Sequence, residues 1–139
     1  MITNNAATRA LTPNGTNLRR GRASLIALWL TQIALAAMFF MAGGSKLAGV
    51  PAMVSMFDAL GLGQWFRYVT GFIEVASGIA LLVPSAAIFG AILLIPTMLG
   101  AAAANLFLGQ SPAAPLVLLL VAAAVAWTRR NQLRGLFSR

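Results

Sequence analysis

Only two side chains in this sequence are carboxylates, Asp58 and Glu74, and the position of Glu74 is the more informative. Glu74 lies inside a long apolar stretch, where a carboxylate is costly unless it finds a partner, takes up a proton or serves a ligand. Two interpretations stand side by side: a proton or ligand site, and a structural bond that locks two helices together. Asp58 lies on the polar side of its segment and is expected to face water.

Lys46 is the predicted partner of Glu74. Lys46 ends the first apolar stretch, and the stretch that contains Glu74 begins on the same side of the membrane. The long side chain of lysine can bend inward along apolar surface. Arg67 is a second candidate, about two helical turns before Glu74 on the same helix. For both cations the alternative is a charged group that extends outward to the membrane interface.

Asn105 completes the candidate buried polar site, which we define as Glu74, Lys46 and Asn105. The Asn105 amide lies late in the third apolar stretch and suits a hydrogen bond to a neighbouring helix or to a ligand carbonyl, of which the helix contact is favoured. No catalytic residue is assigned. The sequence leaves open whether the chain is part of an enzyme, because it offers no self-sufficient catalytic constellation.

The sequence has no cysteine and no histidine, which removes several kinds of chemistry. Without cysteine there is no disulfide, thiol nucleophile or iron–sulfur cluster, and without histidine the usual haem and metal ligands are missing. We therefore predict no metal site. No cofactor motif is evident either, because the pair Gly43-Gly44 lacks the spacing of a nucleotide-binding loop.

The composition places these residues in a membrane. Of the 139 residues, 60% are hydrophobic and 9% are charged, whereas a soluble domain is typically about 25% charged. The net charge is +8, and most of the cations flank the apolar region: Arg9, Arg19, Arg20, Arg22, Arg129, Arg130, Arg134 and Arg139. This arrangement is typical of a chain whose partner is the lipid bilayer. No basic face interleaved with aromatic residues supports a nucleic-acid partner.

We predict an all-α membrane protein, a bundle of four transmembrane helices at about residues 24–46, 65–83, 86–108 and 113–128. Residues 23–45 carry no charge, which is too long for the apolar part of a signal peptide, about 7–15 residues, and suits a retained helix. The apolar region after Arg67 contains one charged residue, Glu74. Turn residues at 84–85 and 109–112 divide this region into three helices.

Residues 51–63 differ from the four spans. Apolar side chains recur here at the spacing of one helical face: Met53, Met56, Phe57 and Leu60. We predict a short amphipathic helix at the membrane interface between the first two spans, with a plain connecting loop as the equal alternative. The chain is thus divided into a flexible basic tail at 1–21, a membrane domain at 22–130 and a basic tail at 131–139.

The distribution of the cations also predicts the orientation. With four spans both termini lie on one side, and eight Lys and Arg residues lie on that side against two on the other. Cytoplasmic segments of membrane proteins carry the excess of cations, so both termini are expected in the cytoplasm. The expected location is a bacterial-type inner (plasma) membrane, which the chain crosses several times.

Three stretches resemble the DoxX-like family of small four-helix membrane proteins, and the likeness spans about residues 24–128: FFMAGGSKL at 39–47, GLG at 61–63 and GFIEVASGIALL at 71–82. In that family a small-residue turn and Lys-Leu close the first helix, and a Gly-x-x-Glu segment opens the second. The resemblance implies that Lys46 and Glu74 are the residues to carry over. Some relatives have a histidine late in the third helix, where this sequence has Asn105, and this departure weakens the transfer of a redox or metal role.

The resemblance implies a link to membrane redox chemistry, since the family is named for a subunit associated with thiosulfate:quinone oxidoreductase. The leading hypothesis is an accessory subunit of a quinone-linked complex, with a quinone as the cofactor and a membrane redox protein, or a second copy of the chain, as the partner. One alternative is a small proton-coupled transporter that uses Glu74, and another is a membrane scaffold without a ligand. Transporters of the small multidrug-resistance type place the key acid in the first helix rather than the second, which favours the first hypothesis.

Overall fold

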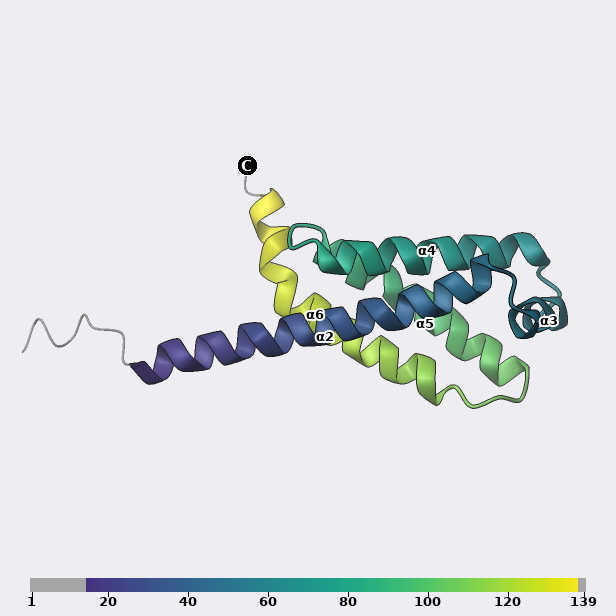
Figure 1. Cartoon of the computed structure of the whole chain (residues 1–139), viewed down its shortest axis with the longest axis horizontal. Coiled ribbons are helices and arrows are strands. Elements are labelled where there is room, and N and C mark those ends of the chain that lie inside the picture. Colours follow the sequence, from purple (N-terminus) through teal and green to yellow (C-terminus); the bar gives the residue numbers. More distant parts are fainter. Residues whose placement is uncertain (1–14, 138–139) are drawn as a thin grey trace, which may run out of the picture. The chain divides into compact units, whose positions relative to one another are not determined.

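Five α-helices make up most of residues 15–137, the part of the chain that the computed structural model describes. They follow one another along the chain as Figure 1 shows: α2 (Gly15–Leu47), α3 (Pro51–Ala59), α4 (Gln64–Leu82), α5 (Ala87–Phe107) and α6 (Ala113–Phe137). The described part contains no strand. The prediction of an all-α protein is confirmed.

Four of these helices contain stretches that are long and apolar enough to cross a membrane: Gly21–Leu47, Gln64–Leu82, Ala87–Phe107 and Ala113–Asn131. A helix rises about 1.5 Å per residue, so about 20 residues cross a hydrocarbon core of about 30 Å. The four-helix membrane bundle expected from the apolar pattern is therefore confirmed. Many large apolar side chains are exposed on the outside of these helices, and in a bilayer they contact lipid.

The helices extend further than the apolar pattern predicts. α2 begins at Gly15 and α6 continues to Phe137, so helix reaches into both segments that the sequence predicts as tails. The reason is that residues 15–23 and 129–137 contain no proline, and several of them, such as leucine, arginine and glutamine, favour helix. Residues 1–14 and 138–139 lie outside the described residues.

The chain divides into two units, residues 1–30 and residues 31–139. The described part of the first unit is the beginning of α2, where the Ser24 hydroxyl donates a hydrogen bond to the Gly21 carbonyl at 2.9 Å. The second unit holds the rest of α2 and all of α3 to α6. Every residue of the candidate site belongs to this second unit.

The short helix α3 forms where the apolar spacing predicts one. Pro51 starts it, which suits a position whose N–H group needs no partner within the helix. Phe57 is buried and packs against Phe66 near the start of α4, with ring centroids 6.1 Å apart, whereas Asp58 is exposed. The segment is therefore a helix rather than a plain loop, and its place at the membrane interface stays a prediction.

Within the second unit, α5 packs against both α4 and α6, and α3 packs against α4 (Figure 1). A glycine lets α5 approach α4 closely, because a Cβ at Gly90 would stand only 2.8 Å from the Ser77 carbonyl oxygen. Such close backbone packing helps to hold helices together in lipid, where apolar side chains gain little by leaving their solvent. Among the largest fully buried side chains are Phe39, Leu81, Ile88, Leu94, Gln32 and Val125.

Candidate functional site

The backbones of α2 and α4 come into contact at two glycines, Gly43 and Gly71. A Cβ added to Gly43 would stand 2.7 Å from the Gly71 carbonyl oxygen and 3.1 Å from the Cβ of Glu74. A Cβ added to Gly71 would stand 3.0 Å from the Cβ of Lys46. Each glycine thus lies against the charged residue of the other helix. The crossing leaves no room for a Cβ at Gly43 and little room at Gly71, and it brings Lys46 and Glu74 close together.

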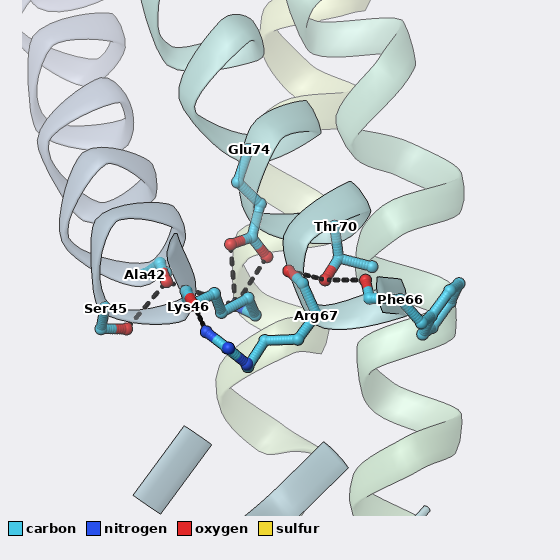
Figure 2. A network of polar contacts seen from close by, with 7 residues as sticks. All are labelled: Ala42, Ser45, Lys46, Phe66, Arg67, Thr70 and Glu74. Atoms are coloured by element: carbon cyan, nitrogen blue, oxygen red, sulfur yellow. Dashed lines mark hydrogen bonds and ion pairs between the residues drawn. The ribbon is translucent and has the colours of Figure 1, made fainter. Parts of the chain in front are cut away.

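Lys46 and Glu74 form an ion pair inside the bundle (Figure 2). The Lys46 amine donates to both carboxylate oxygens, with Nζ 2.7 Å from Oε2 and 3.0 Å from Oε1. The Glu74 side chain is 3% exposed and that of Lys46 is 15% exposed. The same amine also lies 3.5 Å from the Ala42 carbonyl oxygen, which is at the limit of a hydrogen bond. The pairing expected from the sequence is present in the structure, while its role as a functional site stays a prediction.

Arg67, the second candidate partner of Glu74, takes a different place. Its side chain is buried, and its Nη1 donates to the backbone carbonyl of Lys46 in the last turn of α2 (Figure 2). The same carbonyl also accepts a hydrogen bond from the backbone N–H of Gly49 at 3.3 Å, so the guanidinium is a second donor to this oxygen at the end of α2. Its Nε donates to the side-chain oxygen of Gln64 at 2.6 Å. Arg67 therefore donates to the backbone of Lys46 and to Gln64, and not to the Glu74 carboxylate.

Gln64 extends this set of bonds to α3. Its amide nitrogen donates to the Val54 carbonyl at 3.0 Å and to the Asp58 carboxylate at 2.6 Å. Asp58 is exposed, as expected, but it is tied to the start of α4. We call the connected residues Asp58, Gln64, Arg67, Lys46 and Glu74 the α3-end network. It contains two cations and two acids, so its formal charge is zero, and it joins α2, α3 and α4.

Asn105, the third predicted site residue, makes its described hydrogen bond elsewhere. Its Nδ2 donates to the Ser111 carbonyl at 3.0 Å, in the segment that connects α5 to α6. This bond fastens the end of α5 to the following loop. The structure thus brings Lys46 and Glu74 together, and it gives Asn105 a neighbour outside the α3-end network.

A second polar contact within the bundle was missed from the sequence. Gln32 on α2 is 0% exposed, and its Nε2 donates to the Leu81 carbonyl near the end of α4 at 2.9 Å. The Gln32 Oε1 accepts a hydrogen bond from Nη2 of Arg129 on α6 at 2.7 Å. One amide thus connects three helices. The signal in the sequence is that Gln32 is the sole amide side chain in the uncharged stretch 23–45.

Replacing Gln32 with leucine should destabilise the bundle by about 1–3 kcal/mol, because the Leu81 carbonyl and the Arg129 guanidinium each lose a buried partner. The measurement is unfolding of the purified chain by sodium dodecyl sulfate in a mild detergent. Gln110→Leu is the control, since Gln110 is exposed in the loop after α5. Equal unfolding midpoints for the two variants would show that the hydrogen bonds of Gln32 do not stabilise the bundle.

The chemistry available at the α3-end network is that of hydrogen bonding and proton exchange. An ammonium, a guanidinium and two carboxylates can donate to or accept from a ligand oxygen. Among the described residues, no group of three His, Cys, Asp or Glu side chains could hold a metal ion. The network offers a polar site beside the apolar faces of α2 and α4, without a nucleophile activated by a general base.

The comparison with known families agrees with this architecture. The sequence profile of the DoxX-like family matches residues 30–127, which include all four spans in whole or in part and the entire α3-end network. No curated protein and no solved structure matches the chain significantly. The family match covers more than half of the chain and contains the Gly43–Gly71 crossing with its ion pair. The chain therefore belongs to the DoxX-like family.

Proposed function

We propose that the chain is an accessory subunit of a quinone-linked membrane redox complex, with the Lys46–Glu74 pair as its buried polar site. The observation that carries the proposal is this ion pair inside the span formed by α4, held in place by Arg67. The chain has no cysteine or histidine with which to carry electrons, so a partner or a bound quinone would supply the redox chemistry. The family resemblance to redox-associated subunits points the same way.

The geometry around Lys46 suits a quinone carbonyl. An ammonium group has three donors, and two of them are directed at the Glu74 oxygens. The third contact, to the Ala42 carbonyl, is long at 3.5 Å and is the one that a ligand carbonyl would replace. The Lys46 side chain is 15% exposed, so the proposal has a ligand approach the lysine from outside the bundle. A quinone, when bound, supplies two-electron redox chemistry, and Glu74 would hold or release a proton beside it.

Orientation and assembly are part of the same proposal. The cation distribution places both termini in the cytoplasm of a bacterial-type inner membrane, so the α3-end network would lie near the outer surface. The partner would be a membrane redox protein, alone or with a second copy of this chain. An exposed α3 beside the network would give that partner a surface next to the quinone.

The test compares Glu74→Gln with Asp58→Asn in native membranes. We expect Glu74→Gln to lower both the quinone-dependent activity of the co-purifying partner and the yield of quinone in a mild-detergent pull-down, because the amine loses its carboxylate. Asp58→Asn removes the same charge away from the Lys46 amine and keeps a side-chain oxygen that accepts from Gln64, so both values should stay near those of the original chain. Unchanged activity and complex yield in Glu74→Gln would sink the proposal.

The same variants distinguish the two alternatives. Substrate-driven proton flux in proteoliposomes that disappears in Glu74→Gln would make the chain a proton-coupled transporter. A scaffold without a ligand would behave differently, since Glu74→Gln would lower the thermal stability and the complex yield together while no quinone co-purified with either form.

A further inference from the structure

The end of the second unit that lies away from the α3-end network carries cations and no acidic side chain. Arg129 and Arg130 stand in the last turn of the candidate span Ala113–Asn131. The two acids of the sequence, Asp58 and Glu74, both belong to the α3-end network. Gln32, which contacts Arg129, is about 21 Å along α2 from Lys46. The positive charge at this end is therefore not balanced by acidic side chains of the same chain.

Arg130 and Trp127 form a stacked pair on α6. The guanidinium carbon of Arg130 lies 4.2 Å from the centre of the Trp127 ring, and the indole is 69% exposed. Stacking uses the flat face of the guanidinium and leaves its N–H donors at the edge of the plane, where planar or tetrahedral oxyanions bind. Tryptophan at the end of a span belongs at the level of the lipid headgroups. The pair thus presents donors at the depth where phosphates occur.

Arg129, next to this pair on α6, is held by a hydrogen bond to a side chain inside the bundle. Its Nη2 donates to Gln32, and Gln32 is fixed in turn by the Leu81 carbonyl. Gln32 is a neutral acceptor, so this bond orients the guanidinium without cancelling its charge. Arg129 therefore fixes this part of α6 to α2 and α4, and Trp127 and Arg130, which lie in the same turn of α6, are held with it.

We infer that α6 at the end of its membrane span binds the phosphate group of an anionic phospholipid, with Arg130 and Trp127 as the direct contacts and Arg129 as a neighbouring positive charge. Charge complementarity selects this occupant, since a zwitterionic lipid brings a compensating cation with its phosphate. The inference does not depend on the quinone-linked role, because it concerns the other end of the bundle and different residues.

The test uses the full chain in nanodiscs of phosphatidylcholine with increasing phosphatidylglycerol, and the measured quantity is the unfolding temperature. We expect phosphatidylglycerol to raise this temperature, and Arg130→Gln to shift the titration so that about fivefold more anionic lipid is needed. The response of each chain is measured from its own unfolding temperature in phosphatidylcholine alone, because Arg130→Gln also removes the stacking contact on Trp127. Arg130→Lys keeps the charge but loses the planar edge, and should lie between the two.

Arg22→Gln is the control for a diffuse charge effect, since Arg22 is an exposed cation in the first unit. The inference predicts a clearly smaller shift for Arg22→Gln than for Arg130→Gln. Equal shifts for the two variants would mean that stabilisation by anionic lipid depends on total charge alone. An unfolding temperature that does not change with phosphatidylglycerol would mean that no anionic lipid is bound. Either outcome overturns the inference.

Discussion

Replacing Gly43 with alanine should push α2 away from α4 and lower the stability of the bundle. The new Cβ would stand 2.7 Å from the Gly71 carbonyl oxygen and 2.8 Å from Cγ2 of Val75. One of these neighbours is backbone, which cannot rotate aside, so a whole helix must move. Overpacking of this kind costs about 1–3 kcal/mol. Because Gly43 also lies against Glu74, the same movement should lengthen the contact between Glu74 and Lys46.

The neighbouring glycine provides a control with the same chemistry. A Cβ at Gly44 would meet nothing within 4 Å, and alanine is favoured over glycine inside a helix by up to about 1 kcal/mol. Gly44→Ala should therefore be neutral or stabilising. Unfolding midpoints in sodium dodecyl sulfate measure both variants, and a Gly43→Ala chain as stable as Gly44→Ala would show that the helices do not cross at this glycine.

Removing the Glu74 carboxylate should have the largest effect of any single change at the site. Glu74→Ala leaves the Lys46 ammonium inside the bundle without its anion, and breaking a buried pair in this way typically destabilises a protein by about 3–5 kcal/mol. The double variant Lys46→Met with Glu74→Leu replaces both charges by apolar side chains of similar volume. We expect the double variant to recover most of the lost stability, because no buried charge is left alone.

The coupling energy of the pair comes from the unfolding of the single variants Lys46→Met and Glu74→Leu and of the double variant that combines them. A double variant that is as unstable as the sum of the single variants would show that Lys46 and Glu74 do not interact. The stable double variant then separates the two interpretations of the pair. A partner complex that stays active with it would make the pair a lock, whereas a complex that assembles but loses quinone-dependent activity would make it a ligand site.

Much of the fold follows from simple properties of the sequence. Uncharged stretches of bilayer length predict the spans, and turn residues divide them. The pairing of Lys46 with Glu74 also follows, because consecutive spans run in opposite directions and the end of one helix meets the beginning of the next. Spacing along the sequence does not reveal that Gly43 and Gly71 are the point of contact, since a small residue has the same appearance on a packed face as on a face towards lipid.

The sequence does not show which partner each of the other polar side chains binds. Arg67 could donate to Glu74 on its own helix or to a carbonyl of another helix, and in the structure it donates to the carbonyl of Lys46, which accepts this bond in addition to one from the Gly49 N–H. Arg129 belongs to a group of flanking cations that normally face water, yet Gln32 holds its guanidinium inside. The helix ends also exceed the prediction, because helix formation does not stop where the apolar character stops.

The zero formal charge of the α3-end network has an electrical consequence. A membrane potential does work of about 2.3 kcal/mol per 100 mV on each elementary charge that crosses the bilayer. Two cations and two acids connected in one network feel opposing forces that largely cancel. Changes in the membrane voltage should therefore leave the junction of α2, α3 and α4 in place, and a proton gained at Glu74 would make this part of the protein sensitive to the field.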